Sequence, residues 1–199
     1  MRLLIALFFC TSLLADRSFS YKKSSFNNFG QVGLIQLPTA ETAKEGGLFF
    51  TYSQNDMWKT GALLVSPYDW LDASYFYFTP RSIKTLDKGF YLKVNHEFNA
   101  FKLAVGIDDF AGTGLFSREY IVSTVNLKKF KVTSGIGWGE FAQETSFKNP
   151  LSVFSSILDE RNSVSNNYNY GGSLSYDKWF RGNASIFGGI EWDSSRISG

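Results

Sequence analysis

The chain has 199 residues and a formal net charge of +2, from 20 Lys and Arg against 18 Asp and Glu. A charge this close to zero gives no electrostatic footprint for nucleic acid, so the composition argues against that partner. Aromatic residues make up 18% of the chain, which also holds 18 glycines, and this combination favours a β architecture.

The first 20 residues have the pattern of a secretory signal peptide. Arg2 precedes an apolar run that covers residues 3–10, and the small-x-small pattern at 18–20 suits cleavage before Tyr21. No later window approaches the roughly 20 apolar residues that a spanning helix needs. We therefore expect residues 1–20 to be removed from the mature chain.

Cys10 is the only cysteine, and it lies inside this signal. The mature chain is therefore predicted to contain neither a disulfide nor a thiol ligand for a metal. A lipid-anchored alternative needs a small residue before the cysteine. Phe9 stands there instead, which favours the removed signal.

Residues 21–46 are expected to form an N-terminal segment with one short helix. Pro38 precedes the stretch 39–45, and Gly46 and Gly47 follow it. Proline in the first turn and glycine past the last one are the expected limits of a helix. This is the only helix that the sequence predicts after the signal.

From Gly47 onward the hydrophobic residues recur with period two, which predicts strands separated by turn residues. Short breaks such as Asn99-Ala100 alternate with long ones such as 80–88 and 140–167. This is the plan of an all-β, antiparallel up-and-down meander, with tight turns at one rim and long loops at the other. Nine strands are predicted, over residues 48–54, 59–66, 70–79, 89–98, 101–108, 116–125, 130–138, 168–176 and 183–192.

Two observations favour a transmembrane β-barrel for residues 47–199. Several predicted strands reach about 9 or 10 residues, which lets a tilted strand cross a bilayer. Aromatic residues such as Trp58, Trp70 and Trp192 stand near strand ends, where membrane interfaces place them. Period two alone also fits a soluble β-sandwich, so that alternative stays open.

Bacterial single-chain barrels have even strand numbers. The nine predicted strands and the polar tail 194–199 therefore predict a partial, truncated barrel.

The stretch 108–120 concentrates acids, glycines, an Arg-Glu pair and aromatics in one predicted hairpin. Glycine provides the positive φ that its turn requires. Arg118 and Glu119 are neighbours, so they point to opposite faces of a regular strand, where either can meet an opposite charge across the hairpin. The candidate lumen or turn motif consists of Asp108, Asp109, Gly112, Thr113, Gly114, Arg118 and Glu119.

These pieces also carry a resemblance to a known family. The longest reads Val-Gly-Ile-Asp-Asp-Phe-Ala-Gly-Thr-Gly-Leu-Phe-Ser-Arg-Glu-Tyr, and the matching stretches are residues 30–40, 70–75, 87–93, 105–120 and 135–139. The chain resembles the YjbH/GfcD-type family of outer-membrane β-barrel proteins linked to exopolysaccharide and capsule production. The resemblance implies a cell outer membrane location. Outer-membrane lipid, exopolysaccharide and periplasmic polysaccharide-export proteins are the partners it suggests. It brings no catalytic residue and no cofactor.

The sequence gives less support to a catalytic or a metal-binding role. Asp108, Asp109 and Glu119 have the residue type of a glycosidase carboxylate pair, but a structural network is the favoured interpretation. His96 is the only histidine, and neither zinc ligands nor a nucleophile accompany it.

The leading hypothesis is a non-catalytic outer-membrane β-barrel that assists exopolysaccharide or capsule secretion or surface assembly. The alternatives are a general diffusion porin and a soluble secreted β-sandwich that binds or cleaves glycan.

Overall fold

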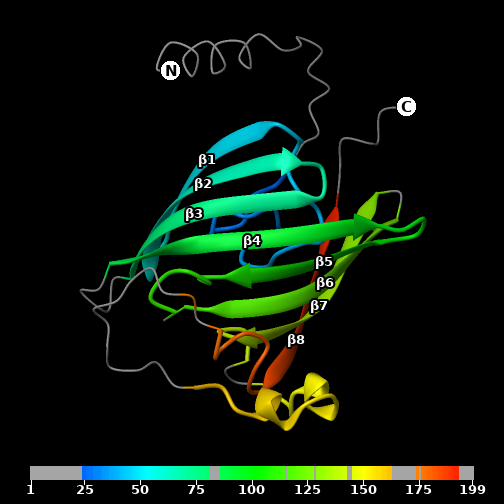
Figure 1. Cartoon of the computed structure of the whole chain (residues 1–199). Coiled ribbons are helices and arrows are strands. Elements are labelled where there is room, and N and C mark those ends of the chain that lie inside the picture. Colours follow the sequence, from blue (N-terminus) through cyan, green and yellow to red (C-terminus); the bar gives the residue numbers. More distant parts are fainter. Residues whose placement is uncertain are drawn as a thin grey trace, which may run out of the picture.

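The protein is an all-β chain built on one antiparallel sheet (Figure 1). The computed structural model describes residues 24–80, 86–114, 116–127, 129–142, 145–162, 174 and 176–192. Its strands are β1 (Gly47–Gln54), β2 (Trp58–Tyr68), β3 (Leu71–Pro80), β4 (Asp87–Glu97), β5 (Lys102–Asp108), β6 (Arg118–Leu127), β7 (Phe130–Gly139) and β8 (Ala184–Trp192).

Each strand pairs with its neighbours in sequence, in the order β1 to β8, which confirms the predicted antiparallel meander. Within the described residues the sheet is open, because β1 and β8 each have a partner on one side only. Eight of the nine predicted strands are present. The ninth, over 168–176, falls largely outside the described residues. In the described sheet, β7 pairs directly with β8.

The two rims of the sheet differ in their connections. One rim carries the tight turns after β2, β4 and β6. The other carries the short β1–β2 turn together with the longer loops, including residues 109–117 between β5 and β6 and residues 140–183 between β7 and β8. We call them the tight-turn rim and the long-loop rim. Their alternation follows the pattern of short and long breaks that the sequence predicted.

Helix is nearly absent from the part of the chain that the structure describes. The 3₁₀ helices η1 (Pro150–Val153) and η2 (Ser156–Asp159) lie in the long connection before β8. Among the described residues, no helix has the length and apolar character needed to cross a membrane.

The predicted helix over 39–45 was wrong, since these residues run as an irregular segment. The reason lies in their hydrogen bonds. The backbone N–H of Ala40 donates to Thr124 Oγ1 at 2.9 Å, and that of Ala43 donates to Asp72 Oδ1 at 3.1 Å. Side chains of distant strands therefore take the backbone donors that a helix would use internally.

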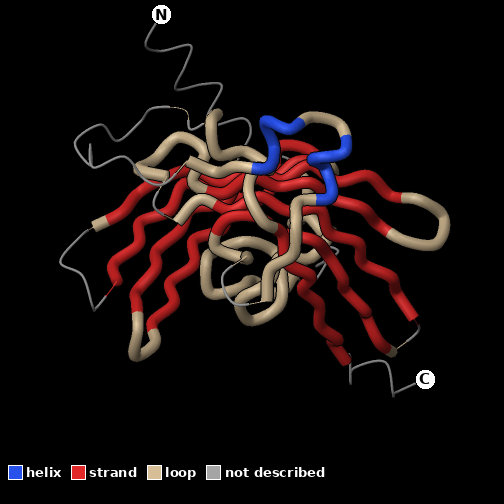
Figure 2. Tube along the Cα trace, turned by 90° about the horizontal axis from the view of Figure 1, so that it is seen from below, coloured by secondary structure: helices blue, strands red, loops and turns tan. Residues whose placement is uncertain are grey.

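The sheet curves into an arch with loop segments inside its hollow (Figure 2). Alternate side chains face the two sides of the arch. The inner, concave face is rich in buried polar and small groups, including Thr60, Ser66, Asp72, Ser74, Lys93, Asn95, Asp108, Arg118, Thr124 and Thr133. Apolar clusters such as Ala62, Phe76, Phe78 and Tyr91 interrupt this polar face.

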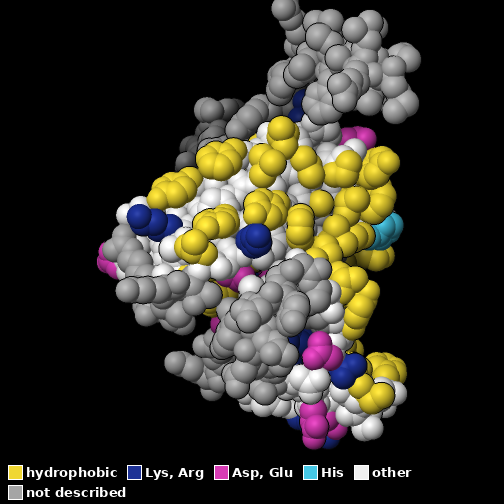
Figure 3. Space-filling view, turned by 60° about the vertical axis from the view of Figure 1, so that its left-hand side comes forward, with side chains coloured by type: hydrophobic (Ala, Val, Ile, Leu, Met, Phe, Trp, Pro, Cys, Tyr) yellow, Lys and Arg dark blue, Asp and Glu magenta, His cyan; other side chains and the backbone are white. Residues whose placement is uncertain are grey.

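The outer, convex face has the opposite character. Many of its outward positions carry large apolar side chains that remain exposed, and Figure 3 shows such side chains spread across the strands in view. Leu48, Phe50, Tyr52, Leu63, Val65, Tyr75, Tyr77, Phe90, Leu92, Val94, Val105, Ile186, Ile190 and Trp192 belong to this set. The sheet therefore exposes its apolar side and covers its polar side.

Candidate functional site

The N-terminal segment, residues 24–46, fills the concave face and is held there by polar side chains of the sheet. Lys93 Nζ donates to the carbonyl oxygen of Val32 at 3.1 Å, and Asn95 Nδ2 donates to that of Ala40 at 3.1 Å. Lys131 Nζ lies 2.9 Å from Glu41 Oε2. Lys93 and Asn95 thereby satisfy backbone carbonyls of the segment that would otherwise be buried unpaired. The segment is thus an internal plug fixed to β4 and β7.

Asp108 and Arg118 form a buried ion pair on the concave face. They are direct partners in the register of β5 and β6, and Arg118 Nε lies 2.5 Å from Asp108 Oδ2. Gln31 of the plug also donates to Asp108. The guanidinium carbon stands 4.0 Å from the ring centre of Phe29 and 5.0 Å from that of Phe141. Gln31 and Phe29 therefore join the plug to this ion pair of the sheet.

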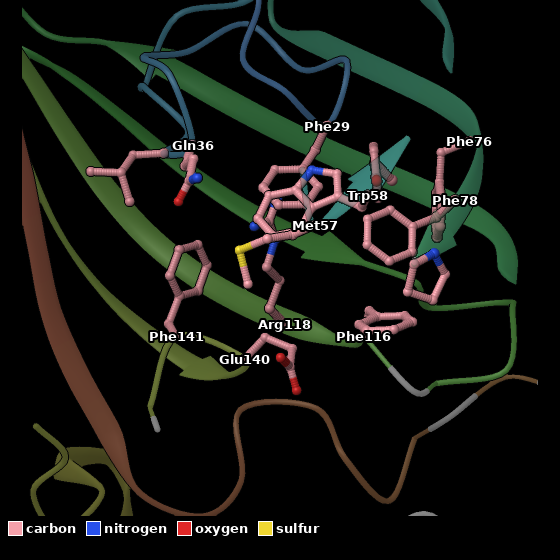
Figure 4. Close-up of a pocket in the computed structure, with 13 residues that line it drawn as sticks. Phe29, Gln36, Met57, Trp58, Phe76, Phe78, Phe116, Arg118, Glu140 and Phe141 are labelled. Atoms are coloured by element: carbon pink, nitrogen blue, oxygen red, sulfur yellow. The ribbon is translucent and has the colours of Figure 1, made fainter. Parts of the chain in front are cut away.

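A pocket of about 350 Å³ opens beside this pair at the long-loop rim (Figure 4). Arg118 reaches from β6 toward Phe29, with Phe141 on one side of it and Phe116 on the other. Further aromatic walls come from Trp58 and from the end of β3. The pocket is an aromatic cavity with a few polar groups, the usual constitution of a ligand site.

Glu119 lies on the opposite side of the same strand. It is fully buried, because Arg161 from the long β7–β8 connection covers it, with Nη1 at 2.6 Å from Oε2 and Nη2 at 3.2 Å from Oε1. The backbone N–H of Phe180 donates to Oε2 at 3.2 Å. Glu119 therefore anchors that connection against the convex face near the long-loop rim.

The remaining motif residues build the loop between β5 and β6. Asp109 has φ of 55°, a left-handed conformation that suits Asp better than most residues. Thr113 Oγ1 donates to Asp87 Oδ1 at 2.8 Å, and the carbonyl of Gly114 accepts from Lys178 Nζ at 2.9 Å. A Cβ on Gly112 would lie 1.8 Å from Asp109 Oδ1, so no larger residue fits there unless the loop moves.

Burial is the largest influence on the pKa values of Asp109 and Lys178 at this loop. Burial, together with the nearby charge of Asp87, raises the pKa of the Asp109 carboxyl to about 8, although the backbone N–H groups of Phe116 and Gly114 lower it in part. Burial likewise lowers the pKa of Lys178. A neutral Asp109 is therefore a substantial population at neutral pH.

The arrangement separates the acids that a glycosidase would use together. Asp108 is paired with Arg118 inside the arch, whereas Glu119 is paired with Arg161 outside it. Two carboxylates on opposite faces of one sheet cannot flank a single glycosidic bond. Within the described residues, no group of three or more His, Cys, Asp or Glu side chains is placed to hold a metal ion.

Sequence reasoning located the hairpin but missed the partners that complete it. Gln31, Phe29 and Arg161 are distant in sequence from the acids or cation they contact. Arg161 gives no local signal, since it stands 42 residues from Glu119 in a connection without regular pattern. The buried acid Asp87 was likewise not singled out, although it opens β4 next to the loop.

Comparisons with known proteins identify the family. The model of the YjbH family, described as exopolysaccharide biosynthesis protein YbjH, matches residues 25–197. The chain is 35% identical over 185 residues to a protein of Escherichia coli (strain K12) named "Uncharacterized lipoprotein YjbH"; the match covers 85% of this chain and 26% of that protein. The chain thus spans about a quarter of the length of that relative. No solved structure matches. This chain belongs to the YjbH family of exopolysaccharide biosynthesis proteins.

Proposed function

We propose that the chain forms part of an outer-membrane β-barrel that assists the secretion or surface assembly of an exopolysaccharide. The observation that carries the proposal is the reversed polarity of the arch. Its exposed convex face is apolar, and its concave face is polar and filled by the plug. Lipid is the solvent that accommodates such an outer face, and a polar lumen suits the inner one.

Aromatic residues at the tight-turn rim support the same placement. Exposed rings stand at each of its three turns and at the end of β8, namely Tyr68, Trp70, Phe98, Phe101, Phe130 and Trp192. Aromatic girdles of this kind mark the level of the lipid headgroups in outer-membrane barrels, where short turns lie on the periplasmic side. The long-loop rim then faces the cell exterior.

The proposal requires both free edges of the sheet to be paired in lipid, since unpaired backbone groups are costly there. Pairing of β1 with β8, or with further strands, would meet this requirement. Residues 1–23 lie outside the described part of the chain, so the cleaved signal at 1–20 stays a prediction. The relative from Escherichia coli is named a lipoprotein, which supports membrane association for this chain as well.

Passage of a polymer is favoured over free diffusion of solutes because the plug occupies the hollow. A general diffusion porin needs a water-filled lumen, whereas here the N-terminal segment is bound to the strands by several hydrogen bonds and an ion pair. The family description adds the link to exopolysaccharide. The action proposed is binding and guidance, without bond chemistry.

Deletion of the gene tests this function. The proposal expects polymer to accumulate inside the deleted cell and to reach the medium again on complementation. It also expects the protein in the outer-membrane fraction, with a gel mobility that changes on heating. Unchanged polymer export would contradict the proposal. A loss of small-solute uptake alone would favour the porin, and purification from the soluble periplasmic fraction would favour the β-sandwich.

A further inference from the structure

The aromatic pocket contains two buried hydrogen-bond donors that lack an acceptor within the described residues. One is the indole Nε1 of Trp58 and the other is Nη2 of Arg118. Both residues line the cavity, and Arg118 is only 7% exposed. A buried donor without an acceptor costs about 1–3 kcal/mol, so the pocket suits a molecule that supplies acceptor oxygens.

The walls of the pocket are flat aromatic side chains. The Phe29 and Trp58 rings stack at 5.9 Å between centres, and Phe78 and Phe116 approach to 4.7 Å at 58°. Phe141 faces them across Arg118 (Figure 4). Aromatic surfaces of this type bury the C–H faces of a ring while leaving its polar edge for hydrogen bonds.

Charge narrows the choice of ligand. The positive charge of the Arg118 guanidinium is already balanced by the Asp108 carboxylate at 2.5 Å. The ion pair therefore offers N–H donors to the pocket but has no net positive charge. A free phosphate would lack a dedicated cation. A hydrocarbon chain would fill the aromatic cavity but leave both donors unsatisfied.

We propose that this pocket binds one pyranose unit of a polysaccharide, with ring C–H faces against the aromatic walls and hydroxyl oxygens accepting from Trp58 Nε1 and Arg118 Nη2. The inference deepens the proposed function and rests on it for the choice of polymer. The volume of about 350 Å³ lies near the lower end of ligand pockets, which span roughly 300–1,000 Å³. Its position at the long-loop rim places it where a polymer would enter or leave the lumen.

The test measures binding of short oligosaccharides, prepared by hydrolysis of the exopolysaccharide that the producing cell secretes. Calorimetry uses the full chain in a micelle of lauryldimethylamine oxide, because a maltoside detergent would itself present sugar. Trp58→Phe keeps the aromatic wall and removes one donor. Trp192→Phe is the matched control, since that indole is exposed on the convex face.

The proposal expects Trp58→Phe to weaken binding by about fivefold to tenfold, the loss of one hydrogen bond, and Trp192→Phe to leave it unchanged. Phe116→Leu gives a second variant that removes a wall and is expected to weaken binding as well. Absence of binding by the parent protein, equal affinities for parent and pocket variants, or displacement of the sugar by laurate would overturn the assignment.

These outcomes are separable from those of the proposed function. Unaltered affinity in Trp58→Phe together with loss of polymer export on gene deletion would reject the pocket and leave the secretion role intact. Pocket-dependent binding together with normal export in the deleted strain would keep the pocket and reject the secretion role.

Discussion

The two faces of the arched sheet differ in polarity and in exposure. On the concave face, Asp72, Lys93 and Asp108 are buried and hydrogen-bonded, and the plug covers them. On the convex face, Phe50 is 74% exposed and Ile186 is 72% exposed. A water-soluble single sheet would normally cover its apolar face and solvate its polar one. This inversion is the observation behind our proposal that the convex face contacts lipid and that the polar face is an interior.

The largest expected effect comes from breaking the buried pair of the concave face. Arg118→Met keeps the apolar stem but leaves Asp108 without its cation, and removing one partner of a buried pair costs about 3–5 kcal/mol. We expect that loss in the free energy of unfolding, measured by urea titration in micelles. Lys102→Met is the control, because its partner Glu97 is largely solvent-exposed and exposed pairs contribute about 0–1 kcal/mol. Equal losses in both variants would contradict the distinction.

A charge on the convex face should cost somewhat less and should depend on depth. Leu92 lies at the centre of β4 and His96 near its tight-turn end, both facing outward. Arginine costs about 2–4 kcal/mol at the middle of a bilayer and about 0–1 near its surface. We expect Leu92→Arg to lower stability in lipid vesicles by the larger amount and His96→Arg by the smaller one. The same small effect at both positions would indicate that water reaches the centre of the strand.

Packing inside the arch gives the third effect. Gly106 lies opposite Tyr120 in the register of β5 and β6, and a Cβ there would stand 2.2 Å from Tyr120 Cζ. Gly106→Ala should therefore destabilise by about 1–3 kcal/mol, because the buried ring must move. Gly61→Ala on the convex face meets nothing within 4 Å and is expected to be neutral or mildly stabilising. Thermal unfolding of the two variants compares the faces directly.

Counted per pH unit, the smallest effect is a pH dependence in the β5–β6 loop. Asp109 has a pKa of about 8 in the fold and about 3.9 when unfolded. The folded chain therefore binds more protons between these values, so stability is full below about pH 4 and declines as pH rises toward about 8. The decline is at most about 1.4 kcal/mol per pH unit.

Asp109→Asn should remove that decline, since the amide does not titrate and Asn tolerates the left-handed backbone of this residue. Unfolding midpoints between pH 4 and pH 9 provide the measurement. Asp56→Asn, in the exposed β1–β2 turn, is the control and should reproduce the parent profile. A parent-like slope in Asp109→Asn would show that another group causes the dependence.

The strands could be predicted from the sequence because their alternation is local. Predicted and observed bounds of the strands in the sheet agree closely, as for residues 130–138 and β7 (Phe130–Gly139). The opposition of Arg118 and Glu119 also follows from period two, and Arg118 does meet an opposite charge across the hairpin, at Asp108. Such features depend on residues a few positions apart.

The plug and the pocket could not be predicted because their contacts join distant segments. Residues 39–45 carry local helix signals, yet Thr124 and Asp72 capture their backbone donors. The contact between Gln31 and Asp108 spans 77 residues. The pocket assembles Phe29, Trp58 and Phe141 from three such segments. Hydrophobic periodicity and turn residues are local patterns, so they do not predict contacts between segments that are distant in sequence.

The most direct test of the central claim asks which solvent touches the convex face. In a Cys10→Ser background, single cysteines along β1 at residues 48–53 would carry spin labels in lipid vesicles, and collisions with dissolved oxygen and with a water-soluble nickel chelate would be measured. Residues 48, 50 and 52 face outward and residues 49, 51 and 53 inward. We predict that the outward labels collide with oxygen and are shielded from nickel, whereas the inward labels collide little with either reagent because the plug packs against that side of β1. Free collision of nickel with the outward labels would contradict a lipid-facing convex surface.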